Sequence, residues 1–167
     1  MSERALSVLE PPSLDLHSAL WTGPDSYEVA PGATRFEQFE ANVAARLGLG
    51  VACRYALGLG VERTWARIRG LAERLREGLG GIERVSVHDK GVVRGGTVTF
   101  TVDGETARQV SGRLRSAGIN TSVTAQSSAV FDLPERGLDD VVRASVHYYN
   151  TESEVDRLIA EVADPSG

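Results

Sequence analysis

The strongest constraint on the fold is the pattern of residues 143–162. Ala144, Val146 and Tyr148 alternate with more polar residues, the period of two that places one set of side chains against a core. At Thr151 the pattern changes to the sequence Thr-Glu-Ser-Glu, typical of a helix capping box, and apolar residues then recur three and four positions apart. The stretch therefore predicts a buried strand with Arg143 at its start, a tight corner and a helix.

The residues before this stretch predict a small sheet and its covering helices. Apolar residues at helical spacing predict helices over residues 37–59, 61–79 and 105–117. Runs of β-branched residues predict strands over residues 85–88, 97–102 and 119–123, with a polar loop at 124–140. This order predicts an α+β domain over residues 35–163, in which a small, mainly antiparallel sheet carries helices on one face.

Residues 1–34 have a different character. Pro11-Pro12, Gly23-Pro24 and Pro31-Gly32 interrupt them, and they show little periodicity, so we expect an extended arm. Leu20 and Trp21 are too apolar for a solvated tail, and the arm is therefore expected to pack on this domain or on a missing one. Residues 164–167 are expected to form a short tail.

Composition excludes several classes of partner. The net charge is −5 and the basic residues are scattered, which argues against nucleic acid. No apolar run is long enough to cross a bilayer, so no membrane partner is expected. Cys53 is the only cysteine, which predicts a reducing, cytoplasmic location, and its helical neighbours predict a buried structural thiol.

No self-contained catalytic motif is present, and we predict neither a catalytic residue nor a metal site. The phosphate-binding, zinc-protease and nucleophile-elbow patterns are all missing. His17, His88 and His147 are far apart in sequence, which does not favour a metal centre. Lys90 lies among glycines in a predicted turn, where a solvated side chain is expected.

Arg143 is the exception, because a guanidinium in an otherwise apolar strand cannot lose its charge and needs an anion. That anion can be a structural carboxylate, such as Asp132 or Asp140. It can equally be the carboxylate of a ligand, held by two hydrogen bonds. The residues alone leave both alternatives open.

The run from Arg143 to Leu158 resembles the C-terminal signature of class V aminotransferases and cysteine desulfurases. Arg35-Phe36-Glu37, Asn42 and Gly48-Leu-Gly50 resemble an earlier segment of the same family, in the same order. The resemblance runs from about residue 9 to 163. It implies the C-terminal portion, with the small domain, of a fold type I enzyme that uses pyridoxal phosphate (PLP), and residues 1–34 as a remnant of the large-domain boundary.

The resemblance also implies roles for individual residues. Arg143 matches the arginine that binds the α-carboxylate of the amino-acid substrate, and Asn42 lies in a segment that approaches the cofactor phosphate. The family enzymes are usually homodimers, so the expected partner is another copy of the chain or a missing large domain. In the pattern, Phe39-Glu40 replaces a Gly-Thr pair, and Glu40 would repel phosphate.

Two departures from the family shape the expected function. Residues 124–140 hold no cysteine where desulfurases carry their catalytic one, which moves the expected reaction toward transaminase, lyase or epimerase chemistry. The family's Schiff-base lysine, stacking histidine and pyridine-binding aspartate lie upstream of this chain, and Lys90 is not in the lysine motif. We therefore expect no PLP to be held by this chain alone and no activity from it. The alternative is a non-catalytic partner or oligomerisation module.

Overall fold

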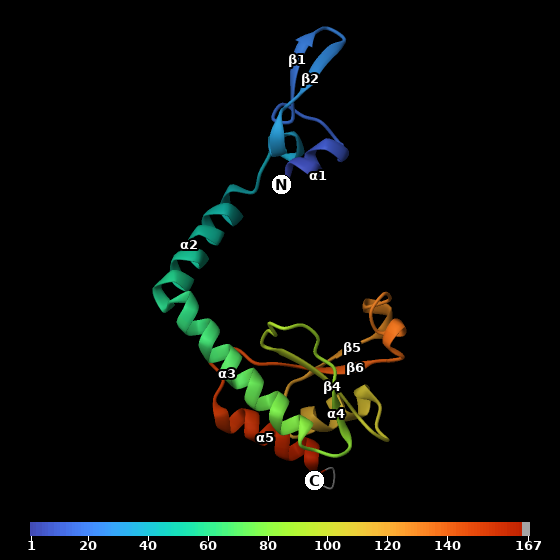
Figure 1. The fold of residues 1–167 in the computed structure, drawn as a ribbon. Coiled ribbons are helices and arrows are strands. Elements are labelled where there is room, and N and C mark those ends of the chain that lie inside the picture. Colours follow the sequence, from blue (N-terminus) through green and yellow to red (C-terminus); the bar gives the residue numbers. More distant parts are fainter. Residues whose placement is uncertain (165–167) are drawn as a thin grey trace. The chain divides into compact units, whose positions relative to one another are not determined.

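The computed structural model describes residues 1–164, which divide into two compact units, one up to Tyr55 and one from Ala56 onward (Figure 1). Residues 165–167 of the predicted tail lie outside the described residues. No helix in the described part is long and apolar enough to cross a membrane.

The first unit is more structured than the predicted extended arm. It holds a short helix, an antiparallel hairpin, a 3-10 turn and the first part of a long helix: α1 (Glu3–Val8), β1 (Ala19–Gly23), β2 (Ser26–Val29), η1 (Gly32–Phe36) and α2 (Val43–Leu59). The expectation of an arm was wrong because the residues around Pro24 form the tight turn of the hairpin, in which Thr22 Oγ1 donates to Ser26 Oγ at 3.0 Å. The boundary predicted after residue 34 stays a prediction.

The second unit is built on a four-stranded sheet in which every neighbouring pair is antiparallel. The strands, in spatial order, are β3 (Val85–Val87), β4 (Thr97–Val102), β6 (Val141–Ser145) and β5 (Ser122–Thr124). The α+β class predicted from the sequence is confirmed. The last strand is shifted from its prediction: it begins at Val141 and ends at Ser145, after which the side-chain carbonyl of Asn150 accepts from His147 N at 2.8 Å and closes the expected corner.

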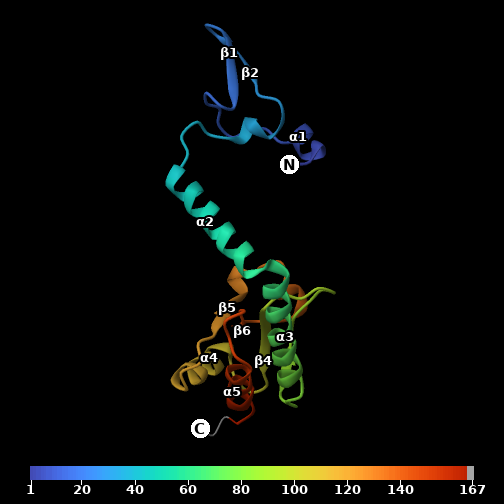
Figure 2. The same cartoon turned by 90° about the vertical axis from the view of Figure 1, so that its left-hand side faces the viewer.

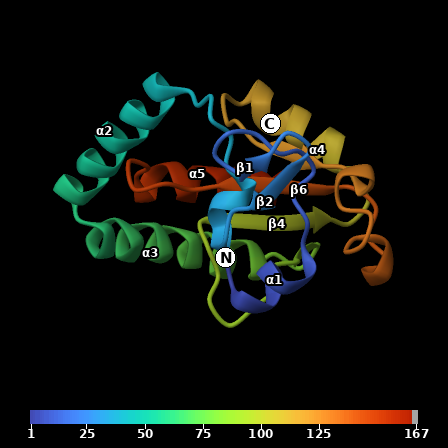
Figure 3. The ribbon, with the colours of Figure 1, turned by 90° about the horizontal axis from the view of Figure 1, so that it is seen from above.

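Three helices cover one face of this sheet: α3 (Val61–Gly80), α4 (Ala107–Ser116) and α5 (Glu152–Ala163). Figures 2 and 3 show α3 and α5 side by side. Both α4 and α5 begin with a capping box, and in α5 the Thr151 hydroxyl accepts from Glu154 N while the Glu154 carboxylate accepts from Thr151 N. Two 3-10 turns interrupt the long loop before β6: η2 (Gln126–Ser128) and η3 (Pro134–Arg136).

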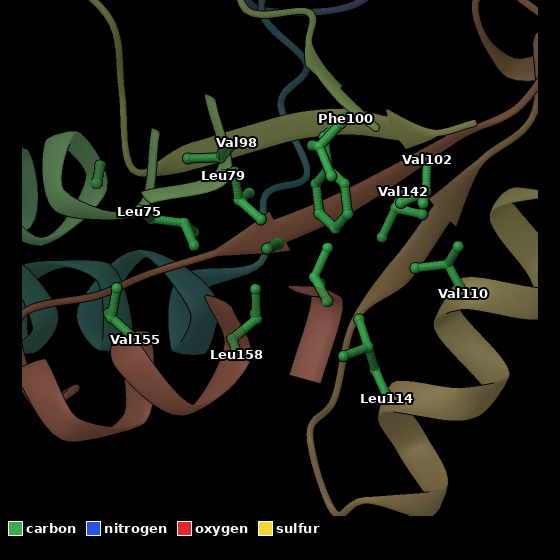
Figure 4. Close-up of a cluster of buried hydrophobic side chains, with 14 of the residues drawn as sticks. Leu75, Leu79, Val98, Phe100, Val102, Val110, Leu114, Val142, Val155 and Leu158 are labelled. Atoms are coloured by element: carbon green, nitrogen blue, oxygen red, sulfur yellow. The ribbon is translucent and has the colours of Figure 1, made fainter. Parts of the chain in front are cut away.

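The core lies between the sheet and these helices. Phe100 is fully buried, and in Figure 4 its ring points from β4 into a space lined by Leu79, Leu114 and Leu158. Val142 is also fully buried and faces the same core as Phe100, because the two residues are partners across β4 and β6. By alternation, the neighbours of these residues lie on the opposite face of the sheet.

A buried ion pair fixes the loop between β3 and β4. Arg76 of α3 donates from Nε to Asp89 at 2.6 Å, and both side chains are buried. The second Asp89 oxygen accepts from Thr99 N at 2.8 Å and from Thr99 Oγ1 at 2.9 Å. Arg76 also donates to the backbone carbonyls of Gly95 and Thr97. The Arg76–Asp89 pair therefore connects α3, the loop and β4. The hydrogen bonds named above use both oxygens of Asp89 and two nitrogens of Arg76.

Gly96 is required where this loop enters β4. A Cβ there would lie 2.5 Å from the Val146 carbonyl oxygen and 2.7 Å from Ile68 Cγ2. We expect Gly96→Ala to lower the free energy of unfolding by about 1–3 kcal/mol, because a backbone atom must move. Gly95→Ala is the matched control, since its Cβ meets nothing within 4 Å. Urea unfolding of the two variants checks this expectation. Equal unfolding midpoints would contradict the close approach of Gly96 to the Val146 carbonyl.

Ion pairs on the surface join α3 to α5. Arg67 binds Glu152 with both Nη atoms, and its hydrogen bond lowers the pKa of Glu152 from its ordinary 4.5 to about 2. Because this pKa is lower in the folded chain, the pair stabilises the fold above pH 4.5 and the contribution is lost as the pH falls toward 2. We expect Glu152→Gln to show a shallower loss of stability across that window.

Acid titration of the unfolding midpoint checks this expectation. Glu83→Gln is the control, because Glu83 is exposed and has no ion pair among the described residues. If Glu152→Gln and the unsubstituted chain lose stability with the same slope between pH 4.5 and 2, the pair does not contribute.

Candidate functional site

Arg143 lies at the centre of β6, on the sheet face opposite the helices. Its partners across the two neighbouring strands are Thr99 of β4 and Ser122 of β5. Val142 and Ala144, on either side of it, are buried in the core, so alternation turns the Arg143 side chain outward. We call this surface, which carries Thr97, Thr99, Ser122, Arg143 and Ser145, the open face.

Neither carboxylate that the sequence suggested as a partner for Arg143 binds it. Asp132 is held by Lys90 at 2.8 Å and by Arg136 at 2.9 Å. Asp140 accepts from Gln126 N at 3.1 Å and lies 3.8 Å from Arg108. Arg143 forms no ion pair within residues 1–164, and its side chain donates from Nε to Ser122 Oγ at 3.0 Å.

The open face therefore presents a cation whose partner is a neutral hydroxyl. A guanidinium carries five N–H donors in a planar fork that matches the two oxygens of a carboxylate. Arg143 is exposed, so its remaining donors are accessible from solvent. The structure pairs Asp132 and Asp140 with other groups, and the binding of a ligand carboxylate by Arg143 stays a prediction.

A polar hollow of about 370 Å³ lies next to Arg143 on the same face. Thr97 and Thr99 form part of its floor, and it is lined by both cations and carboxylates, among them Lys90, Asp132 and Arg136. Hydrogen bonds from Lys90 and then Arg136 lower the pKa of Asp132, which keeps this carboxylate ionised and engaged. Four cations, Arg76, Lys90, Arg94 and Arg136, line the hollow against two carboxylates, Asp89 and Asp132, so its lining carries a net positive charge.

His88 borders the hollow, and one of its two ring nitrogens is hydrogen-bonded. Its Nε2 lies 2.8 Å from Thr101 Oγ1, and its backbone carbonyl accepts from Arg136. Burial, followed by the nearby Arg136 charge, lowers the pKa of His88, so the ring is neutral near pH 7.

Asn42, the residue predicted to lie near a cofactor phosphate, caps a helix. Its side-chain carbonyl accepts from Ala45 N at 2.9 Å, and its backbone carbonyl accepts from Arg46 N, so it begins α2. Asn42 and Arg143 belong to different units, and the structure defines no site that contains both. Whether Asn42 also approaches a phosphate stays a prediction.

The described residues do not fit a PLP site. Lys90 is the only lysine of the chain, and it is exposed and paired with Asp132 at 2.8 Å instead of lying in a dry pocket that would favour its neutral form. The Asn42 carboxamide oxygen is already used by α2. Within residues 1–164 no group of three or more histidine, cysteine or acidic side chains is arranged to hold a metal ion.

Cys53 and Ser122 differ in the structure from what the sequence indicated. Cys53, expected to be buried, is exposed on α2, because none of the residues of that helix is buried. Ser122 was not singled out, although it lies in a predicted strand. The register between the two strands pairs Ser122 with Arg143. The alternation of residues within one strand does not reveal this register.

Comparison with known proteins adds a family match. The family model for aminotransferase class-V matches residues 16–158, which is most of the chain. The "probable cysteine desulfurase 2" of Mycobacterium leprae (strain TN) is 33% identical over 165 residues, covering 96% of this chain and 39% of that protein. The chain thus spans about two fifths of the length of this relative.

Solved structures agree with this match. The apo cysteine desulfurase of Thermococcus onnurineus NA1 superposes with a TM-score of 0.79 at 26% identity, covering 96% of this chain and 40% of the other. The cystine C–S lyase C-DES, as a mutant with glycine covalently linked to the PLP cofactor, superposes with a TM-score of 0.71 over 98% of this chain and 40% of the other. At 24% identity, this second likeness shows the fold alone.

Proposed function

Because the chain belongs to the class V aminotransferase family, we propose that it forms the C-terminal, small-domain portion of a PLP-dependent enzyme acting on an amino acid. Its contribution is to bind the α-carboxylate of the substrate through Arg143. The observation that carries this proposal is the position of Arg143 on the open face, with Ser122 on Nε and no acidic partner among the described residues.

The chemistry of bond breaking belongs to the cofactor, which acts as an electron sink when it is bound. This chain supplies orientation: a carboxylate held by two guanidinium N–H groups fixes the position of the substrate. The residues that would hold PLP are not among those described, so we propose that the chain is inactive alone. Residues 124–140 contain no cysteine, which speaks against a desulfurase reaction. The proposed reaction is therefore of the transaminase, lyase or epimerase type.

Discrimination between a carboxylate and an amide tests the proposal. The 167-residue chain is titrated with L-alanine and, separately, with L-alaninamide, and backbone amide shifts are followed by NMR. We expect L-alanine to move the amides of Thr99, Ser122 and Arg143 in a saturable way and L-alaninamide to leave them in place, because only the former carries a carboxylate. Equal responses to both ligands would contradict the proposal.

The exposed apolar surface of α2 favours a second candidate, a partner or oligomerisation module. Val43, Leu47, Leu49, Val51 and Tyr55 are 58–68% exposed, and a Cβ at Gly48 meets nothing within 4 Å. Exposed apolar residues in such a row are typical of a surface that another chain or domain covers. We propose that α2 packs against another copy of this chain or the large domain of a complete enzyme.

Sedimentation velocity tests the α2 surface directly. We expect the chain to self-associate as its concentration rises, and Leu47→Glu to shift the distribution toward monomer, since a buried charge would oppose association. Ala66→Glu places the same charge on an exposed position of α3 and should leave association unchanged. A concentration-independent monomer with an unaltered α2 would exclude the second copy as the covering partner.

A further inference from the structure

Ser122 and Arg143 are held opposite each other by the sheet. Both belong to the antiparallel pair formed by β5 and β6, in which they are direct partners. Such partners lie side by side on one face of a sheet, within reach of each other's side chains. The Arg143 Nε group donates to Ser122 Oγ at 3.0 Å, within the ordinary range of a hydrogen bond.

This contact uses one particular edge of the guanidinium. A carboxylate can approach Arg143 side-on, through Nε and one Nη, or end-on, through both Nη atoms. Because Nε already donates to Ser122, the side-on edge is occupied. The two Nη groups form no hydrogen bond among the described residues, so the end-on edge is the one left for a ligand.

Other hydroxyls near Arg143 are engaged elsewhere. Thr99, its partner on the other side, donates from Oγ1 to Asp89 at 2.9 Å. The Ser145 hydroxyl lies 3.4 Å from Thr97 Oγ1. Among these neighbours, Ser122 is the residue whose side chain contacts the guanidinium. Ser122 lies on β5, an edge strand, where a β-branched replacement is well tolerated.

We propose that Ser122 is a positioning residue for Arg143: its hydroxyl holds Nε and commits the guanidinium to end-on binding of a substrate carboxylate. This inference rests on the proposed function, because it assigns the geometry of the same site. Fixing the arginine before the ligand arrives reduces the conformational freedom lost on binding. Ser122 does not itself touch the ligand.

A matched set of variants isolates the hydroxyl. Ser122→Ala removes it, Ser122→Thr keeps it, and Ser122→Val has the shape of threonine without it. The 167-residue chain and each variant are titrated with sodium acetate, and the Arg143 Nε–Hε resonance is followed by ¹H–¹⁵N NMR, assigned by its loss in Arg143→Gln. Backbone amide spectra confirm that each variant is folded.

We expect acetate to bind Ser122→Ala and Ser122→Val about fivefold more weakly than the unsubstituted chain, which is about 1 kcal/mol, and Ser122→Thr to restore the affinity. Without ligand, the Hε resonance should move in the Ala and Val variants and stay near its original position with Thr. On adding acetate, Hε should shift strongly only where the hydroxyl is missing, because Nε is then free to take part.

The outcomes separate this inference from the proposed function. If Arg143→Gln binds acetate as well as the unsubstituted chain, Arg143 is not the carboxylate site and both fail. If Arg143→Gln loses binding while all three Ser122 variants bind as the unsubstituted chain does, only the role of Ser122 is overturned. Equal weakening by Ala, Val and Thr would also overturn it, since the effect would then not depend on the hydroxyl.

Discussion

Replacing Asp89 with asparagine is expected to lower the free energy of unfolding of the second unit by about 3–5 kcal/mol. Asp89 accepts from Arg76 and from both Thr99 donors, and its side chain is 7% exposed while that of Arg76 is 4% exposed. An asparagine can still accept from Thr99 through its carbonyl, but it then turns an amide donor toward the Arg76 Nε donor. The arginine charge would remain buried without its partner.

Urea unfolding followed by circular dichroism measures this effect. Asp132→Asn is the matched control, because it makes the same chemical change at an exposed carboxylate that also pairs with cations. Asp132→Asn should lower the free energy of unfolding far less than Asp89→Asn, since water replaces the lost partner at the exposed site. Equal shifts in the two variants would show that the Arg76–Asp89 pair is not a structural anchor.

Arg143→Gln is expected to abolish the saturable response of the open face to carboxylates. Glutamine keeps polar atoms at the position but removes the charge and the two-nitrogen fork. Arg143→Lys keeps the charge and loses the fork, so we expect it to bind L-alanine about tenfold more weakly, in line with charge-assisted hydrogen bonds of about 1.5–3 kcal/mol.

The amides of Thr99 and Ser122 report this binding, because both residues pair with Arg143 across the sheet. Arg108→Gln is the control, since Arg108 is 77% exposed and 3.8 Å from Asp140, in the same chain but outside the open face. If Arg108→Gln weakens binding as much as Arg143→Gln, the response reflects net charge and not a site.

The parts of the fold that the sequence predicted correctly depend on local signals. Thr151 begins α5 with the predicted capping box, and the alternation around Ala144 gave a strand with one buried face. Arg143 was identified because a permanent charge in an apolar strand requires an explanation. In each case the deciding interactions involve residues close in sequence, which is why a pattern of a few residues was sufficient.

The parts that were missed depend on which residues and strands lie beside each other. Ser122 became relevant through the register of β5 on β6, and Asp89 through a side chain on α3, thirteen residues earlier. Trp21 and Tyr27, partners in the hairpin of the first unit, were assigned to an arm because their strands are short and exposed. A sequence pattern reports periodicity, and it does not report which strand lies beside which.

The most direct test of the central claim is whether the Arg143 guanidinium itself contacts a carboxylate. The Nη resonances of Arg143 are followed by ¹⁵N NMR in the 167-residue chain during titration with L-alanine, with L-alaninamide as the reference ligand. We predict that L-alanine shifts the Nη resonances and slows rotation of the guanidinium, and that L-alaninamide does neither. Identical Nη behaviour with both ligands would contradict the assignment of Arg143 as the carboxylate-binding residue.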